Sequence, residues 1–264
     1  MIEVIRGSGP VVLGLPHTGT DVPPEVWARL NARGRGLDDT DWHIDRLYRG
    51  VGRDVTVVRT PVHRYVIDAN RDPSGQSLYP GQNTTGLVPL TDFDGNAIWE
   101  PGQEPDAAEI ERRRVAYHAP YHAALATEIA RLRDIHRQVI LYDCHSIRSV
   151  IPYLFDGTLP DFNIGTNMST SCAMPVENLV AGICSGAEGY SNVVNGRFKG
   201  GWTTRHYGHP EAGIHAIQME LAQSTYMTEA APWEWQNAKV TRLKPVLSRI
   251  INGLEDLVES RALG

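Results

Sequence analysis

The sequence predicts an α/β protein with three layers, formed by residues 1–264 as a single domain. Short apolar runs rich in β-branched residues alternate along the chain with segments whose apolar residues recur at helical spacing. Two of the runs end abruptly in polar side chains, which is typical of strands that present chemistry at the carboxyl edge of an open sheet. No internal repeat or linker interrupts the alternation, and this favours one layered domain.

The composition is ordinary for a globular protein and excludes several other classes. Hydrophobic residues make up 41% and charged residues 21% of the chain, which excludes disorder. The net charge of -6 gives no reason to expect nucleic acid or an anionic membrane as a partner. We find neither a membrane span nor a signal peptide, and three cysteines cannot form a complete disulfide framework. We therefore expect a cytoplasmic protein, whose oligomeric state the sequence leaves open.

The expected strands are the β-branched and apolar runs. Residues 1–16 are interpreted as two short strands or a hairpin around the turn Gly7-Ser8-Gly9-Pro10. Residues 55–59 form a β-branched strand, and residues 65–68 are a candidate for another. Further strands are expected within 138–146, 153–166, 190–195 and 214–221.

Helical spacing of apolar residues and capping signals predict the helices. They are expected at 22–30, from Asp41 to Val51, at 106–135 with a break at Pro120, and at 175–187. A last helical region is expected to open at Pro232 and Trp233 and to be amphipathic over 243–262, where it covers the sheet. Residues 72–105 are rich in turn-forming residues, but their scattered apolar side chains favour an ordered, functional loop. A second glycine-rich loop is expected at 196–213.

Two histidines follow apolar runs that are far apart in the sequence. His17 comes after the run at 11–15, and His145 ends the run that starts at 138. Neutral imidazole is the commonest metal ligand, so two strand-end histidines that meet would form a zinc site. Another divalent transition metal stays possible, and the alternative is that each is an ordinary loop histidine.

A catalytic zinc usually takes three protein ligands and leaves one position for water. Asp41 is the first candidate for the third ligand and Asp45 the second, because residues four apart share one face of a helix. One of them would bind the metal while the other orients a ligand imidazole. The alternatives are a helix cap for Asp41 and a surface charge for Asp45.

Three further features carry chemistry. Asn70 and Arg71 offer amide and guanidinium donors to a substrate carboxylate, although a surface turn is the alternative. Glu220 lies in a mostly apolar run, where a carboxylate is costly unless it is paired or functional. Beside a metal site it would act as a general base, and the alternative is a buried ion pair with an arginine. Cys144 lacks the local signature of a nucleophile.

The motifs resemble, in their order along the chain, those of the N-formylglutamate amidohydrolase (deformylase) family. The resemblance covers about residues 10–230 and rests on Pro16-His17-Thr18-Gly19, Asp39-Thr40-Asp41-Trp42, Arg64-Tyr65-Val66-Ile67-Asp68-Ala69-Asn70-Arg71, Asp143-Cys144-His145-Ser146 and Gln218-Met219-Glu220-Leu221. It implies a fold similar to the zinc-dependent exopeptidases, a three-layer α/β/α sandwich with a mixed, mostly parallel sheet.

The resemblance also implies roles for individual residues. His17 and His145 match the zinc histidines, Asn70 and Arg71 the carboxylate clamp, and Glu220 the base. Carboxypeptidases place their carboxylate ligand three residues after the first histidine, where this sequence has Thr20. The third ligand must therefore come from elsewhere.

The expected function is the zinc-dependent hydrolysis of N-formyl-L-glutamate to L-glutamate and formate. The partner is then a small dicarboxylate, with no nucleic acid or membrane involved. The residues expected to hold it are Asn70, Arg71, Arg64, Arg148 and Arg205. The alternatives are an amidohydrolase for another N-acyl amino acid, and a non-catalytic binding protein with the same fold.

Overall fold

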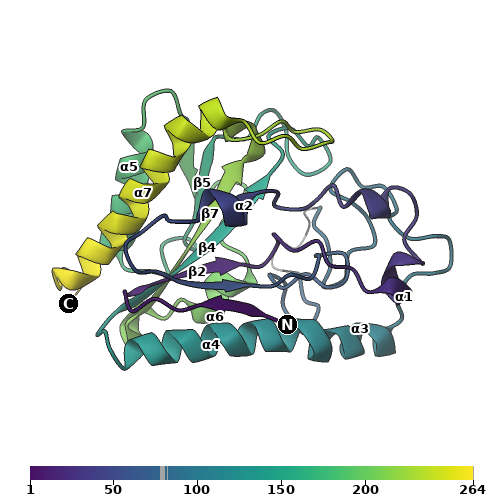
Figure 1. The fold of residues 1–264 in the computed structure, drawn as a ribbon, viewed down its shortest axis with the longest axis horizontal. Coiled ribbons are helices and arrows are strands. Elements are labelled where there is room, and N and C mark those ends of the chain that lie inside the picture. Colours follow the sequence, from purple (N-terminus) through teal and green to yellow (C-terminus); the bar gives the residue numbers. More distant parts are fainter. Residues whose placement is uncertain (78–80, 82, 264) are drawn as a thin grey trace.

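A mixed sheet forms the centre of the molecule (Figure 1). The computed structural model describes residues 1–77, 81 and 83–263. The strands in this part of the chain are β1 (Glu3–Ile5), β2 (Val11–Leu15), β3 (Thr56–Arg59), β4 (Val139–Ile147), β5 (Phe162–Gly165), β6 (Asn192–Val194) and β7 (Ile214–Ala222). Their order in the sheet is β1-β3-β2-β4-β7-β5-β6. β1–β3 and β5–β7 are antiparallel pairs, and the other neighbouring pairs are parallel.

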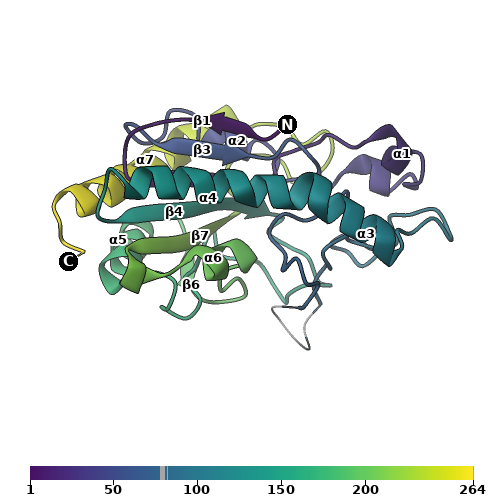
Figure 2. The ribbon, with the colours of Figure 1, turned by 90° about the horizontal axis from the view of Figure 1, so that it is seen from below.

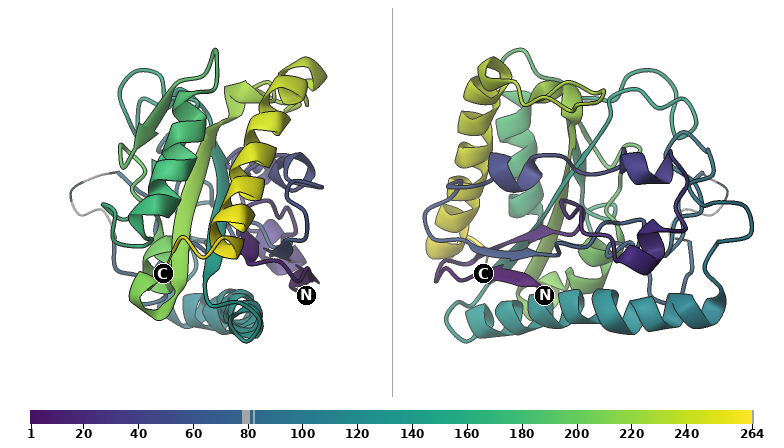
Figure 3. Two further views of the ribbon diagram at one scale, coloured as in Figure 1. Left: turned by 90° about the vertical axis from the view of Figure 1, so that its left-hand side faces the viewer. Right: turned by 45° about the vertical axis from the view of Figure 1, so that its right-hand side comes forward.

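Helices cover both faces of the sheet. The α-helices in the described part are α1 (Pro24–Trp27), α2 (Ile44–Leu47), α3 (Ala107–Arg113), α4 (Ala119–Arg133), α5 (Met174–Ser185), α6 (Trp202–Tyr207) and α7 (Asn237–Glu259). Short 3-10 turns occupy Gly34–Gly36, Pro210–Ala212 and Gln223–Thr225, and Arg114–His118 is π-helical. Figure 2 shows α4 and α6 on one face, and Figure 3 shows α5 and α7 on the other.

Each face of the sheet has its own apolar core, because successive side chains of a strand point to opposite faces. Leu13 and Tyr142 belong to the core beneath α5 and α7. Their neighbours Val12 and Leu141 belong to the core beneath α4. The central strands are buried on both sides, which explains their almost continuous apolar runs. The predicted α/β fold, with three layers and a mixed, mostly parallel sheet, is confirmed.

Two details of the strands depend on the tertiary structure. Residues 1–16 form the two expected short strands, β1 and β2, but not a hairpin, because β3 lies between them and pairs with both. Residues 65–68 form a turn followed by irregular backbone instead of a strand. Their apolar side chains pack in a local cluster with Trp99 and Leu30. The run of apolar residues that suggested a strand therefore belongs to a packed loop.

The predicted helices differ from the structure in detail. The segment 106–135 is divided into α3 and α4 near Pro120, as expected, but the π-helical turn Arg114–His118 connects the two, and Pro120 lies in the first turn of α4, where the missing N–H needs no partner. The region from Asp41 to Val51 is mostly irregular, since His43 has a left-handed φ of 62° and α2 begins only at Ile44. The expected loop at 196–213 contains α6, and α7 begins at Asn237, a few residues after Pro232 and Trp233, where the last helical region was expected to open.

No helix in the described ranges combines the length and the apolar character that a bilayer crossing would require. That residues 1–264 form a single domain stays a prediction.

The core beneath α4 offers a test of the layered packing. Leu141 is completely buried on β4, so Leu141→Ala is expected to lower the free energy of unfolding by about 2–5 kcal/mol through lost burial and a cavity. Leu90 is 52% exposed, and Leu90→Ala should change the free energy of unfolding by no more than about 0.5 kcal/mol. Urea denaturation measures both, and equal effects would contradict the assignment of Leu141 to the core.

Candidate active site

Three neighbouring strands deliver polar side chains to one edge of the sheet. β2 and β4 are parallel neighbours, so His17, just beyond the end of β2, lies close to His145 near the end of β4. β7 pairs with β4 in a register that sets Glu220 directly beside His145. The expected meeting of two distant strand-end histidines therefore occurs, and Glu220 joins them.

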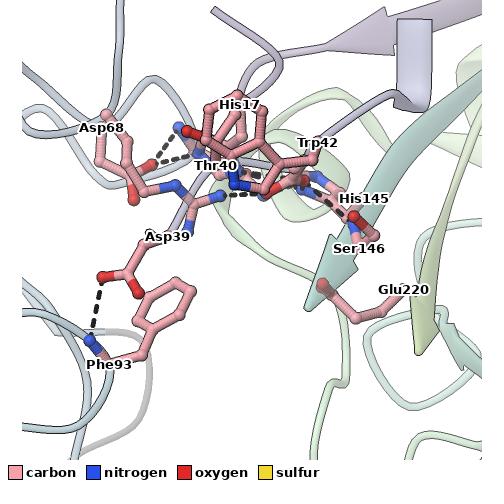
Figure 4. Close-up of polar contacts among 12 residues, drawn as sticks. His17, Asp39, Thr40, Trp42, Asp68, Phe93, His145, Ser146 and Glu220 are labelled. Atoms are coloured by element: carbon pink, nitrogen blue, oxygen red, sulfur yellow. Dashed lines mark hydrogen bonds and ion pairs between the residues drawn. The ribbon is translucent and has the colours of Figure 1, made fainter. Parts of the chain in front are cut away.

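His17 and His145, which are labelled in Figure 4, and Asp41 have ligand atoms that all lie within 4.8 Å of one another. His17 Nδ1 lies 3.1 Å from His145 Nδ1. Asp41 Oδ2 lies 3.3 Å from His145 Nδ1 and 3.8 Å from His17 Nδ1. All three residues are buried. They form the group of described residues that could hold a metal ion.

The remaining nitrogen of each imidazole is held by a carboxylate. His17 Nε2 lies 2.6 Å from Asp68 Oδ1, and His145 Nε2 lies 2.9 Å from Asp143 Oδ2. If each Nε2–H donates to its carboxylate, each Nδ1 keeps its lone pair directed at the other ligand atoms. Histidine ligands of metals are typically oriented by a carboxylate in this way.

Asp41 reaches the group from an irregular segment. Its backbone N–H donates to the carbonyl of His17 at 3.0 Å, which joins the two segments. Arg64 Nη2 donates to Asp41 Oδ1 at 2.8 Å, and the backbone N–H of Ser146 donates to Oδ2 at 3.1 Å. The expectation that Asp41 and Asp45 share a helix face is wrong, because Asp41 precedes α2. Asp45 lines a different cavity, beside Tyr48.

The spacing of these donor atoms fits a tetrahedral metal. Bonds of 2.0–2.2 Å to nitrogen and oxygen put neighbouring ligand atoms about 3.3 Å apart. The separations of 3.1, 3.3 and 3.8 Å lie around that value without any adjustment of the side chains. Two imidazoles and one carboxylate are also a typical ligand set for catalytic zinc.

The electrostatics of the group favour a cation. Burial, together with the charge of Arg64, lowers the pKa of His17 to about 4, so its imidazole is neutral and able to bind metal. Burial opposes ionisation of Asp41, but Arg64 and the imidazoles hold its pKa below the usual value. For His145, Asp143 and Asp41 outweigh burial and raise the pKa, which shows that positive charge is stabilised at this imidazole.

Glu220 lies at the same edge with its carboxylate directed toward the histidines (Figure 4). Burial raises its pKa to about 7, and the charges of Asp41 and Asp143 add to that effect. Among the described residues, the ion pairs do not include Glu220. Gln218 Nε2 donates to Glu220 Oε2 at 3.0 Å, while Gln218 Oε1 accepts from the backbone N–H of Gly201.

A pocket with about 610 Å³ of empty space opens over this edge. Phe93, Ile147, Leu154 and Phe198 give it apolar walls. Besides the histidines, its polar lining includes Arg64, Asn70, Arg71, Arg197, Gln218 and Glu220. Of the expected substrate-binding residues, Asn70, Arg71 and Arg64 therefore line one pocket with Glu220.

The structure gives Asn70 and Arg71 different surroundings. Asn70 Oδ1 accepts from the backbone N–H of Thr203 at 2.9 Å, and its Nδ2 lies 3.4 Å from Asp143 Oδ2. The amide of Asn70 therefore supports the carboxylate behind His145. Arg71 Nε and Nη2 donate to the carbonyl and hydroxyl of Thr85, both at 2.9 Å, so the guanidinium is fixed at the pocket wall.

The described residues that line this pocket do not include Arg148 or Arg205. Arg148 Nη2 lies 3.0 Å from Asp94 Oδ2, on a neighbouring loop. Arg205 belongs to α6, and its Nε donates to the carbonyl of Gly200.

Three residues of the site received no role from the sequence. Asp143 and Gln218 each stand two positions before a functional candidate, His145 and Glu220, on the same strand. Since residues i and i+2 share one face of a strand, their spacing was a usable signal. Arg197 follows a glycine in an irregular segment, where no periodicity indicates a direction.

Sequence comparisons give a consistent result. The sequence model of N-formylglutamate amidohydrolase matches residues 9–227. A relative from Pseudomonas aeruginosa, named N-formylglutamate deformylase, is 44% identical over 251 residues, which cover 94% of each chain. A relative of the same name from Pseudomonas putida is 43% identical over 251 residues, covering 94% of this chain and 93% of the relative.

Solved structures share the fold. The crystal structure of N-formylglutamate amidohydrolase from Ralstonia eutropha has a TM-score of 0.81 at 24% identity and covers 98% of both chains. A gene product from Agrobacterium tumefaciens has a TM-score of 0.71 at 20% identity, with 96% of both chains covered. At these identities the structural similarity supports the arrangement of the sheet and helices.

Proposed function

This chain is an enzyme of the N-formylglutamate amidohydrolase family, and we propose that it hydrolyses N-formyl-L-glutamate to L-glutamate and formate. The observation that carries the proposal is the buried group His17, Asp41 and His145, which opens on a pocket that also contains Glu220 and arginines. Metal ligands, a base and cationic groups in one pocket are what hydrolysis of an anionic amide requires.

The proposed cofactor is zinc, held by His17, Asp41 and His145. A metal ion in this group supplies Lewis acidity, which polarises a carbonyl and makes water more acidic. Asp68 and Asp143 hold the two imidazoles in the orientation that the ligand role needs. Arg64 holds Asp41 as a carboxylate, because the pair lies 2.8 Å apart and is buried.

Glu220 is the proposed general base. It takes a proton from the water that attacks the formyl carbon and passes it to the amine nitrogen as the C–N bond breaks. The pKa of about 7 that burial gives Glu220 suits both steps, since a group with a pKa near neutrality can accept and return a proton. Gln218 keeps one oxygen of Glu220 in place through its amide.

Arg71 is proposed to bind the α-carboxylate of the substrate. A guanidinium donates two parallel hydrogen bonds to a carboxylate, and the contacts with Thr85 hold Arg71 ready for them. Arg64 is proposed to contact the substrate as well, because it lines the pocket and its Nε has no hydrogen-bond partner among the described residues. Asn70 is proposed to assist from beside Arg71.

The proposed setting is the cytoplasm. Cys144, Cys172 and Cys184 are each free and buried, which suits a compartment where thiols stay reduced.

Formate release from a panel of substrates tests the function. N-formylglutamate should be hydrolysed, and N-formylglutamine, which lacks the side-chain charge, should be poorer by roughly thirty-fold or more in kcat/KM, the usual worth of one desolvated charge pair. Faster release of acetate from N-acetylglutamate would favour an amidohydrolase for another N-acyl amino acid. Binding of N-formylglutamate without any release of formate would indicate a non-catalytic protein.

A further inference from the structure

Two arginines of the pocket are anchored on one short segment. Arg71 donates to the carbonyl of Thr85 at 2.9 Å, and Arg197 Nη2 donates to the carbonyl of Asn83 at 2.9 Å. The two residues are far apart in the sequence, yet both line the pocket that contains Glu220. The segment 83–85 thus holds two guanidinium groups on one wall of the pocket.

The spacing of these anchors suits a small dicarboxylate. The Cα atoms of Asn83 and Thr85, two residues apart, cannot lie farther than about 7 Å from each other. Each of their carbonyls accepts a hydrogen bond from one of the two guanidinium groups, and all four residues line the same pocket. A small substrate with two carboxylates that places one on Arg71 thus has Arg197 as a second cation in the same pocket.

The surroundings of Arg197 fix its guanidinium in place. Its Nε donates to the carbonyl of Leu154 at 3.0 Å, and its guanidinium carbon lies 5.5 Å from the ring centre of Phe198. Leu154 and Phe198 are themselves apolar walls of the pocket. A cation that is already oriented and lies beside apolar surface binds an anion more strongly than a mobile one in water.

The other arginines are placed differently. Arg64 is committed to Asp41 inside the ligand group. Arg148 is paired with Asp94, and neither it nor Arg205 is among the described residues that line the pocket. Arg71 and Arg197 are thus the two described arginines that line the pocket outside the ligand group, and Arg71 Nη1 lies 3.7 Å from Asp68 Oδ2.

From this arrangement we propose that Arg197 binds the side-chain carboxylate of the substrate and so makes the enzyme selective for N-formylglutamate over uncharged analogues. The inference rests on the proposed function. It names the residue that binds the side-chain carboxylate, since Arg71 is proposed to bind only the α-carboxylate.

The test compares two substrates on matched variants. Arg197→Gln is expected to lower kcat/KM for N-formylglutamate by roughly thirty-fold to several thousand-fold, because one partner of a desolvated charge pair is lost. The same variant should change kcat/KM for N-formylglutamine by less than about three-fold, since that substrate has no side-chain charge to pair. The preference for N-formylglutamate over N-formylglutamine, measured as the ratio of the two kcat/KM values, should therefore be largely lost in Arg197→Gln.

Arg71→Gln is the matched control, because Arg71 is anchored on the same segment. Both substrates keep the α-carboxylate, so this variant should lower kcat/KM for both by a similar factor and preserve the preference. Arg112 is exposed on α3, and Arg112→Gln should behave as the wild type. Arg148→Gln and Arg205→Gln should also retain the preference. If Arg197→Gln is unstable, Arg197→Lys keeps the charge and should retain part of the preference.

Three results are decisive. Retention of the wild-type preference by Arg197→Gln, or its loss in Arg148→Gln or Arg205→Gln instead, overturns the assignment of Arg197 and leaves the proposed function standing. If Arg197→Gln lowers kcat/KM equally for N-formylglutamate and N-formylglutamine, Arg197 has a structural role, and this result overturns the assignment as well. Absence of formate release from N-formylglutamate by the wild type overturns the proposed function itself.

Discussion

His17→Ala and His145→Ala are each expected to abolish zinc binding and activity together. Each variant removes one of three protein ligands, and the buried carboxylate of Asp41 cannot complete the site with a single imidazole. Metal content measured by mass spectrometry and formate release should fall in parallel. Circular dichroism and thermal unfolding should show that the variants still fold, since both side chains lie at an edge of the sheet outside its apolar cores.

The matched pair for this experiment is Asp41→Asn and Asp45→Asn, the same substitution four positions apart. Asp41→Asn should lose metal, because Asp41 Oδ2 lies among the imidazole nitrogens. Asp45→Asn should keep both metal and activity, because Asp45 lines another cavity. Full zinc occupancy in either histidine variant, or metal loss in Asp45→Asn, would contradict the ligand assignment.

Glu220→Gln is expected to lower kcat by roughly two to four orders of magnitude, the usual worth of general acid–base catalysis. Glutamine keeps the shape of the side chain but cannot accept the proton from water. Bound zinc should be unchanged, since Glu220 is not part of the ligand group. Steady-state formate release gives kcat, and metal analysis of the same sample gives occupancy.

Glu128→Gln is the control for the effect of neutralising a buried glutamate. Glu128 has a buried side chain, as Glu220 has, but it lies on α4 in ion pairs with Arg6 and Arg131. Loss of the Glu128 charge can lower the stability of the fold but does not change a residue of the pocket, so kcat should stay at the wild-type value. A near-normal kcat for Glu220→Gln would show that Glu220 is structural and that another group moves the proton.

Some features of the site follow from the sequence because they depend on strands. A buried strand that ends in polar residues must present them at a sheet edge, and parallel strands end at the same edge. His17, His145 and Glu220 could therefore be grouped without coordinates. Helices α4, α5 and α7 follow in the same way from their apolar periodicity, apart from their ends, whereas the segment of α6 was expected to be a loop.

What the sequence determined about this protein by itself is thus the α/β layering and the expectation that His17, His145 and Glu220 lie at one edge of the sheet. Only the tertiary structure places Asp41 rather than Asp45 beside the histidines, because Asp41 reaches them from an irregular segment in which His43 has a left-handed backbone. It also decided which arginines enter the pocket, selecting Arg197 and leaving out Arg148 and Arg205. Long side chains on irregular segments have no periodicity, so their direction is set by contacts between distant parts of the chain.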